Sequence, residues 1–186
     1  MDAAVITKRI SFETALGVFN VDARVEPSIH SVTEVTLNEA IPTEVLPEGM
    51  SVKRRRAALL FVESACQLRR VSFSCSLNSP VSGGSCSGQG LEAIEWEDSG
   101  SLVVVGTEDA DFLNQRLPFL RLKQDEAIVT YSPSSITVSL ENIAPKQQLS
   151  LHFVIAENPN PEPAECSAWY AVDCLHTSLR QAAPSS

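Results

Sequence analysis

Small residues flank Cys86 in the segment GSCSG (84–88), which has the spacing of a nucleophile elbow. In that motif a sharp strand-to-helix turn exposes the nucleophile, and glycine or serine on either side permits the turn. A nucleophilic cysteine also needs a histidine base, and the chain offers His30, His152 and His176. No helical pattern follows the motif, and any Ser/Gly-rich loop meets the template easily. A cysteine-dependent hydrolase using Cys86 is therefore the third of three functional hypotheses.

Cys166, Cys174 and His176 are side chains of the types that bind zinc. The segment 166–174 is predicted to be a strand, in which residues 8 positions apart lie about 26 Å from each other. The two cysteines could not share an ion across that length. We therefore expect buried, inert thiols here, no metal centre and no cofactor.

Glu108, Asp109 and Asp111 gather directly after a predicted strand. Hard cations such as Ca²⁺ prefer six or more oxygen ligands, which loops at one end of a sandwich can supply. A solvated negative surface explains the same residues equally simply. The sequence leaves open whether this acidic loop binds a cation.

The only basic run consists of Lys53, Arg54, Arg55 and Arg56. On a chain of net charge −9, an isolated basic patch attracts an acidic partner, so we predict that these four residues contact a protein partner, which includes a second copy of the chain. Aromatic residues make up 6% of the chain and none lies within the run, so the stacking surface of a nucleic-acid binder is missing. We expect no nucleic-acid partner.

The two tryptophans have different sequence surroundings. Trp96 lies among acidic residues, a setting that predicts an exposed ring able to bind a small ligand or a sugar. Trp169 has alanines nearby, which predicts a place in the core. Trp96 is thus the candidate ligand-binding residue.

The elements that must position these residues are mostly strands. Alternation is strongest where Ile136, Val138 and Leu140 alternate with small polar residues, and again over 149–155; period 2 indicates a strand with one buried face. A short turn between these two strands predicts that they share a core. Helical spacing is found only at 110–115. The predicted strands cover 6–12, 17–25, 31–37, 57–62, 68–77, 91–96, 102–105, 127–131, 136–140, 149–155 and 166–174.

Many short strands with little helix predict an all-β fold, an antiparallel two-layer sandwich that is immunoglobulin-like or jelly-roll-like. We expect residues 1–186 to form a single domain of this kind. The Ser/Gly-rich segment 79–90 lacks apolar residues and is predicted to be a flexible surface loop. The chain is expected to be disordered from about residue 178.

Composition restricts the cellular setting. The 5 cysteines form an odd set without a CxxC pair, which is typical of reduced thiols. The N-terminus has no apolar run of signal-peptide length, and no window could span a bilayer. Up to Ala93 there are 9 basic and 10 acidic residues, and after it 5 and 13, so the two parts carry −1 and −8. We expect an acidic cytoplasmic protein with no membrane partner.

Part of the C-terminal third resembles a known family. Residues 142–145 (NIAP) form a corner, 149–155 an alternating strand, and Tyr170, Val172 and Asp173 a closing strand. This order is similar to the last strands of bacterial immunoglobulin-like domains of the cell-adhesion-related and NEW3 kind, with Lys146 in place of the corner glycine. The resemblance covers 136–173 and implies a sandwich with a binding or spacer role and no active site. Those relatives lie mostly outside the cytoplasm, unlike the location expected here.

Three functions remain. The first is a non-enzymatic protein-interaction or assembly module, because no residue constellation indicates catalysis. The second is a small-ligand or carbohydrate-binding sandwich that uses Trp96. The third is the hydrolase based on Cys86.

Overall fold

The computed structural model describes residues 4–29, 32–79, 81–88, 90–123 and 126–183, with Cys86 described by its backbone alone. The strands are β1 (Ile6–Thr14), β2 (Gly17–Pro27), β3 (Thr33–Ala40), β4 (Arg54–Ser64), β5 (Leu68–Asn78), β6 (Gly84–Gly88), β7 (Leu91–Glu97), β8 (Ser101–Glu108), β9 (Val129–Ser132), β10 (Ser135–Ile143) and β11 (Gln148–Pro159). The helices are α1 (Ala110–Arg116), the short 3₁₀ turn η1 (Pro118–Leu120), α2 (Ser167–Val172) and α3 (His176–Ala182).

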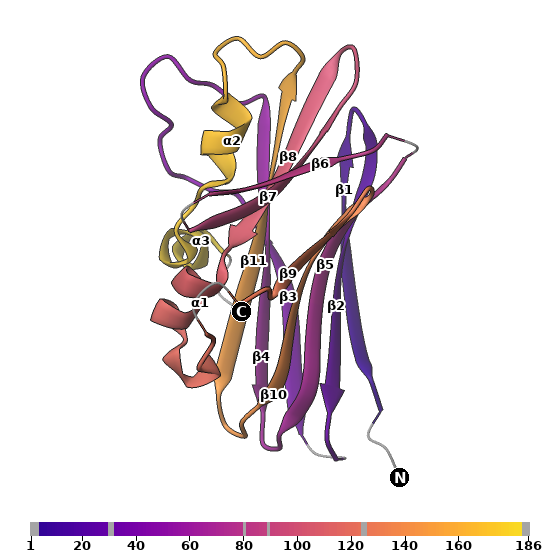
Figure 1. Ribbon diagram of the computed structural model, residues 1–186, viewed down its shortest axis with the longest axis vertical. Helices are drawn as coiled ribbons and strands as arrows, with labels where there is room; N and C mark the ends of the chain where they lie inside the picture. Colours follow the sequence, from indigo (N-terminus) through magenta and orange to yellow (C-terminus); the bar gives the residue numbers. More distant parts are fainter. Residues whose placement is uncertain (1–3, 30–31, 80, 89, 124–125, 184–186) are drawn as a thin grey trace.

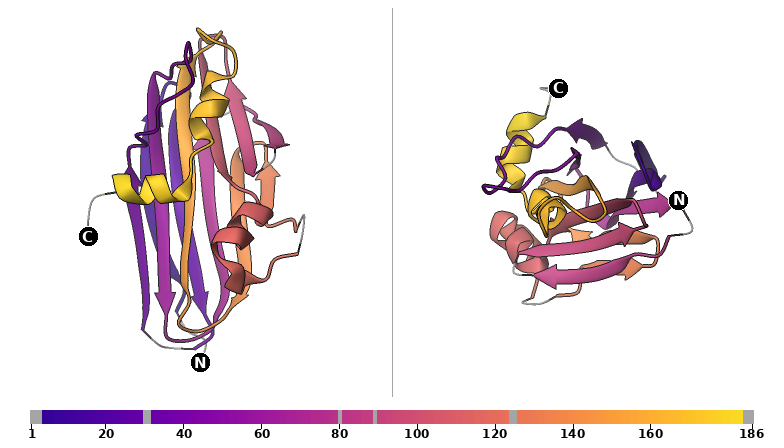
Figure 2. Two further views of the ribbon diagram at one scale, coloured as in Figure 1. Left: turned by 90° about the vertical axis from the view of Figure 1, so that its left-hand side faces the viewer. Right: turned by 90° about the horizontal axis from the view of Figure 1, so that it is seen from above.

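The strands form two sheets that pack face to face (Figures 1 and 2). One sheet has the order β1-β2-β5-β10-β9, and the other the order β3-β4-β11-β8-β7-β6. Every strand pairing in the described part of the chain is antiparallel. Among the described residues, strands account for 54% and helices for 13%, which confirms the predicted all-β sandwich.

The main core lies between the two sheets and follows the predicted alternation. On β10, Ile136, Val138 and Leu140 are buried, as their period-2 spacing predicts. Phe73 of β5 stacks on Phe153 of β11 across the layers, with ring centroids 4.6 Å apart. β10 and β11 lie in different sheets, so the short turn between them connects the two layers of one core.

A second core lies on the outer face of the six-stranded sheet, under α2 and α3 (Figure 2). The prediction of a strand over 166–174 is wrong, because Ser167–Val172 form a helix. Ala168, Ala171 and Val172 are buried at the i, i+3, i+4 spacing of a helical face. Gly106 of β8 permits the close approach of α2, since a Cβ there would lie 2.8 Å from Cγ2 of Val172.

The predicted flexible loop 79–90 contains an ordered strand. β6 pairs antiparallel with β7 at the edge of the six-stranded sheet, so the loop prediction is wrong for Gly84–Gly88. Backbone hydrogen bonding to β7 orders this segment although it has no large apolar side chain. Residues 80 and 89 lie outside the described residues.

The C-terminal segment is also more ordered than predicted. Disorder from about residue 178 was expected, but α3 continues to Ala182. His176 and Leu179, three positions apart, are buried against the protein, which explains the order. Residues 184–186 lie outside the described part. None of the helices in the described segments is long and apolar enough to cross a bilayer.

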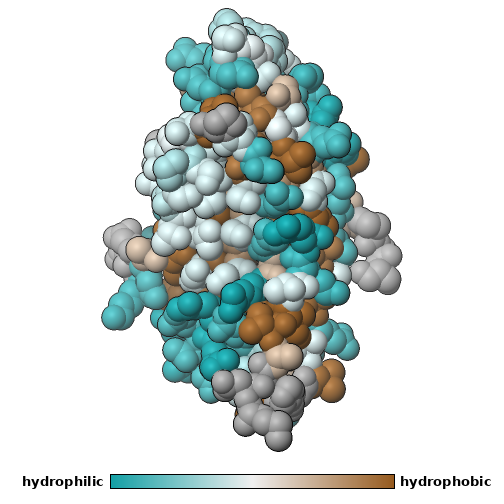
Figure 3. Space-filling view, turned by 90° about the vertical axis from the view of Figure 1, so that its right-hand side faces the viewer, coloured by the Kyte–Doolittle hydropathy of each residue, from teal (hydrophilic) through white to brown (hydrophobic). Residues whose placement is uncertain are grey.

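The side of the molecule that carries β1 and β2 is mostly hydrophilic to neutral (Figure 3). Its hydrophobic areas are separate from one another in this view. Rows of small hydroxyl side chains contribute to the neutral character: Thr137 and Ser139 on β10 lie opposite Ser74 and Ser72 on β5.

Candidate functional site

The basic run that was predicted to bind a partner lies at the start of β4, where it contacts the protein itself. The Lys53 ammonium donates to Oε1 of Glu157 at 2.7 Å, and the carboxylate of Glu157 is almost fully buried. Arg54 donates to the carbonyl oxygen of Glu13 at 2.7 Å. The two most exposed members of the run thus already have partners within the chain.

Arg55 has a structural role. Its guanidinium donates to the carbonyl oxygens of Pro42, Glu44 and Ala171, at 3.2, 2.6 and 3.4 Å. It therefore connects the segment before β4 to helix α2. The fourth member, Arg56, lies 3.3 Å from the carboxylate of Glu39 on β3.

Trp96 is buried, contrary to the exposed position predicted for it. Its exposed fraction is 0%, and its ring lies edge-on to Phe19 with centroids 5.1 Å apart. The indole Nε1 donates to the carbonyl oxygen of Pro133 at 3.0 Å. Since no ring face is available to a ligand, this position does not support sugar binding.

Trp169, predicted to be core, is half-buried on α2 and donates to Glu95.

The acidic loop and Cys86 were considered as possible sites, and the structure gives their surroundings. Asp109 is the N-cap of α1 and accepts from the backbone N–H of Phe112 and of Gly90, both at 2.8 Å. Glu108 instead pairs with Arg116, so the acidic side chains serve different partners. Cys86 lies inside β6, where the sharp strand-to-helix turn of a nucleophile elbow is absent.

A larger hollow of about 420 Å³ beside α1 is lined by four carboxylates: Glu92, Asp109, Asp111 and Glu126. Three of them are engaged within the chain, because Asp109 caps α1, Glu92 accepts a hydrogen bond from the hydroxyl of Tyr131, and Glu126 accepts one from the backbone N–H of Lys123. This hollow is therefore a weaker candidate for a binding site than the groove on β3, β4 and β11.

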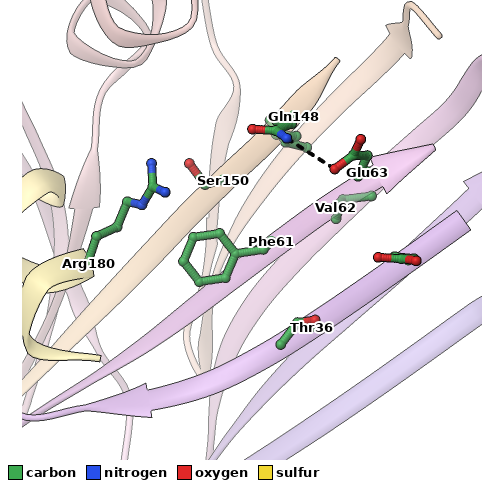
Figure 4. Close-up of a pocket in the computed structure, with 9 residues that line it drawn as sticks. Thr36, Phe61, Val62, Glu63, Gln148, Ser150 and Arg180 are labelled. Carbon is green, nitrogen blue, oxygen red and sulfur yellow. Dashed lines mark hydrogen bonds between the residues drawn. The ribbon is translucent and has the colours of Figure 1, made fainter. Parts of the chain in front are cut away.

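The outer face of β3, β4 and β11 carries a groove below α3, where no helix covers the strands (Figure 2). Its volume is about 210 Å³. Figure 4 shows its principal side chains on three neighbouring strands and on α3. The lining consists of Glu34, Thr36, Phe61, Val62, Glu63, Gln148, Leu149, Ser150 and Arg180; we call it the outer-sheet groove.

One end of the outer-sheet groove is basic and the other is acidic. The guanidinium of Arg180 lies over the ring of Phe61, 5.6 Å from its centroid. At the other end Glu34 of β3 lies directly opposite Glu63 of β4 in the strand register, and both are exposed. Gln148 donates to Glu63 at 3.1 Å.

An adjoining hollow extends the acidic end. Its volume is about 260 Å³, and it shares Glu34 and Glu63 with the outer-sheet groove. Its lining also includes Lys146, Ser64, Ala65 and the exposed Val32, which is 74% accessible. The two hollows adjoin each other at Glu34 and Glu63, and β3 forms the edge of this sheet.

A buried polar cluster lies close to the groove, under the start of α3. Nδ1 of His152, on the outer face of β11, is 3.0 Å from Nδ1 of His176, the first residue of α3. Oε2 of Glu108 is 3.9 Å from Nδ1 of His152. Arg116 donates to both oxygens of Glu108, the shortest distance being 2.5 Å, and also to Oγ of Ser150 at 2.9 Å.

Burial controls the charge of both histidines. It lowers the pKa of His152 to about 4, with a further lowering by Arg116 and a partial opposing effect of Glu108. Burial also lowers the pKa of His176, and the neighbouring His152, Arg116 and Arg180 add to this effect. The two imidazoles are therefore neutral at physiological pH.

The sequence pointed to His176 but not to this cluster. In the sequence, His176 was considered as a zinc ligand together with Cys166 and Cys174. In the structure Cys166 is exposed, whereas Cys174 is buried and lines a small cavity together with His152. A histidine within the otherwise apolar stretch 151–156 of β11 is the available signal for His152. Comparisons with protein-family models, with curated proteins and with solved structures find no match for this chain.

Proposed function

We propose that the protein is a non-enzymatic binding module that recognises an extended segment of a partner protein in the outer-sheet groove. The partner segment carries a basic side chain that binds between Glu34 and Glu63, and an acidic group that binds Arg180. The observation that carries the proposal is the Glu34–Glu63 pair. Like charges directly opposite each other on neighbouring strands destabilise a sheet, and a basic group from a partner would remove that cost.

The charge of the whole chain supports the same partner. At a net charge of −9, the protein attracts a basic segment at long range and accelerates its association. The position of the groove beside β3 also supports an extended occupant, because β3 forms one edge of its sheet. A peptide can lie along such an edge and place alternate side chains in the hollows.

The basic run Lys53–Arg56 is a less suitable contact than expected. Lys53, Arg55 and Arg56 contact groups of the same chain, and a partner would have to replace those contacts. A partner that binds in the outer-sheet groove would not have to replace a salt bridge of Glu34 or of Arg180 within the described part of the chain. This difference is why we place the partner in the groove.

We also propose that the protein works in a reducing compartment such as the cytoplasm. Cys75, Cys166 and Cys174 are free thiols. The similarity of 136–173 to immunoglobulin-like domains supports a binding role, although Tyr170 and Val172 lie in α2 rather than in a closing strand.

Charge reversal tests the proposed function. The purified protein is used to capture partners from its native cells, in parallel with a Glu34→Lys, Glu63→Lys double variant and with Arg180→Glu. A control variant reverses two exposed carboxylates away from the groove, Glu13 and Glu97. We expect the same captured protein with wild type and control, and its loss with both groove variants.

Self-association must be measured first. Sedimentation at low and at high salt shows whether the segment belongs to a second copy of this chain. If all variants capture the same proteins and sediment like the wild type, the groove does not bind a partner and the proposal is wrong.

A further inference from the structure

We propose that Glu108, His152 and His176 bind a zinc ion, with a water molecule as the fourth ligand, and that this ion fastens α3 to the six-stranded sheet. The inference goes beyond the partner binding proposed for the groove and does not depend on it. The three residues come from β8, β11 and α3, so one ion would connect two strands with the C-terminal helix.

The spacing of the ligand atoms fits one ion. The candidate atoms of the three side chains all lie within 4.8 Å of one another. Zinc binds nitrogen and carboxylate oxygen at 2.0–2.2 Å in a tetrahedral arrangement, which places neighbouring ligand atoms about 3.3 to 3.5 Å apart. The observed separations of 3.0 and 3.9 Å lie on either side of this value. The third separation, between Glu108 and His176, is at most 4.8 Å, so side-chain rotations would have to bring the three atoms to bonding distance.

The chemistry of the donors favours zinc. Two imidazoles and one carboxylate form a set found in zinc sites that keep one open position. Both histidines are almost fully buried, at 2% and 3% accessible. Arg116 holds the carboxylate of Glu108 in a fixed orientation, as second-shell partners do for metal ligands.

The structure also provides space for the fourth ligand. A cavity of about 20 Å³ adjoins the cluster and is lined by Glu108, His152, Asp173 and Cys174, among other residues. That volume is enough for about one water molecule. The cavity gives a small ligand a place beside the cluster without any rearrangement of the core.

One ring nitrogen of the cluster has no partner. Nε2 of His176 is buried and makes no hydrogen bond to the described residues. Buried polar groups without partners are rare in native proteins, and an ion with its bound water would reduce the cost of leaving this nitrogen unpaired.

The competing explanation is a direct hydrogen bond between the histidines. With one ring protonated on Nδ1 and the other not, the distance of 3.0 Å needs no ion. That explanation leaves Glu108 as a partner of Arg116 alone. The two explanations differ in whether the protein binds zinc.

Calorimetry separates them. Metal-free protein, prepared without a histidine tag, is titrated with Zn²⁺, and we expect one ion per chain. Changes to second-shell residues alone weaken metal affinity by about 10- to 100-fold, so we expect His152→Gln and His176→Gln to weaken it by at least about 100-fold. His30→Gln, which removes the remaining histidine of the sequence, serves as the control and should bind like the wild type.

A histidine variant could lose zinc binding because it misfolds, so two further measurements use the folded wild type. Zinc at about 100 times its dissociation constant should raise the unfolding midpoint by about 5 to 10 °C. Co²⁺ in place of zinc should show the strong visible bands of a tetrahedral site, unchanged in Cys174→Ser. Absence of zinc binding to the wild type, or wild-type affinity in both histidine variants, would overturn the inference and leave the hydrogen bond.

Discussion

Glu34 and Glu63 lie directly opposite each other on β3 and β4, with both side chains exposed on the outer face of the sheet. On the same two strands Glu39 has a basic neighbour, Arg56, at 3.3 Å. One acidic residue of β3, Glu39, is thus paired with a basic residue, whereas Glu34 faces another carboxylate. A like-charge pair that costs stability is expected where a charged partner binds.

Replacing Glu34 by lysine should therefore stabilise the isolated protein. The new lysine would face Glu63 as an opposite charge, and we expect the free energy of unfolding to rise by about 0.2 to 1 kcal/mol, more at low salt than at high salt. Urea unfolding at two salt concentrations measures the change. The control Glu39→Lys, which breaks the pair with Arg56, should lower stability or leave it unchanged. A Glu34→Lys variant less stable than the wild type would mean that the carboxylate has a structural partner.

Alanine substitutions at two adjacent glycines of the Ser/Gly-rich segment should have different effects on stability. A Cβ on Gly83 would lie 2.7 Å from Nε1 of Trp96 and 2.8 Å from Ile94, whereas one on Gly84 would meet nothing within 4 Å. Gly83→Ala should cost about 1 to 3 kcal/mol through overpacking, and Gly84→Ala should be neutral or slightly stabilising. Thermal unfolding compares the two. Equal midpoints would show that the segment does not pack on Trp96.

The burial of Trp96, which was predicted to be exposed, shows which sequence pattern should have been used for this residue. Period 2 in β7 places Ile94 and Trp96 on the inner face and the glutamates at 95 and 97 on the outer face, so acidic neighbours in the sequence do not imply an exposed ring. The same kind of pattern predicted the other strands up to residue 155 except β6, which was predicted to be part of a flexible loop. The helix α2 was missed because strand and helix spacing are hard to distinguish in a segment of 6 residues.

Arg55 and Arg54 should differ in their effect on stability. Arg55→Gln removes a charged donor from the carbonyl oxygens of Pro42, Glu44 and Ala171, which we expect to cost about 2 to 4 kcal/mol. Arg54→Gln affects an exposed side chain and should cost less than about 1 kcal/mol. Urea unfolding of both variants checks the order. If the two costs are equal, Arg55 does not connect the segment before β4 to α2.

Cys75 should be unreactive and should make stability depend on alkaline pH. Burial, with a smaller effect of the charge on Asp22, raises the pKa of its thiol. The folded protein then keeps a proton that the unfolded chain loses above about pH 8.5. Stability should fall above that pH by about 1.4 kcal/mol per pH unit for this group, and Cys75→Ala should remove that part of the slope.

Thiol labelling gives a direct comparison with an exposed cysteine. At pH 8 the exposed Cys166 should react with a thiol reagent in the native state, and Cys75 only after unfolding. Native labelling of Cys75 at the rate of Cys166 would contradict its place in the core.

The two candidate sites could not be predicted from the sequence, for a common physical reason. Glu34 and Glu63 meet only through the register of β3 on β4. His152 and His176 meet only because the first residue of α3 lies against β11, at a separation of 24 residues. Spacing along the chain reports neighbours on one element, and these pairs arise from packing between elements.

Site-specific photo-cross-linking tests the central claim, that a partner protein binds in the outer-sheet groove. A photoreactive amino acid replaces Thr36, an exposed residue of β3 in the groove, or Thr130, an exposed residue of β9 at the edge of the other sheet. After illumination in native cells, we predict a cross-linked partner from position 36 and none from position 130, with the product lost in the Glu34→Lys, Glu63→Lys background. Equal products from both positions, or a product at position 36 that survives the charge reversal, would contradict the claim.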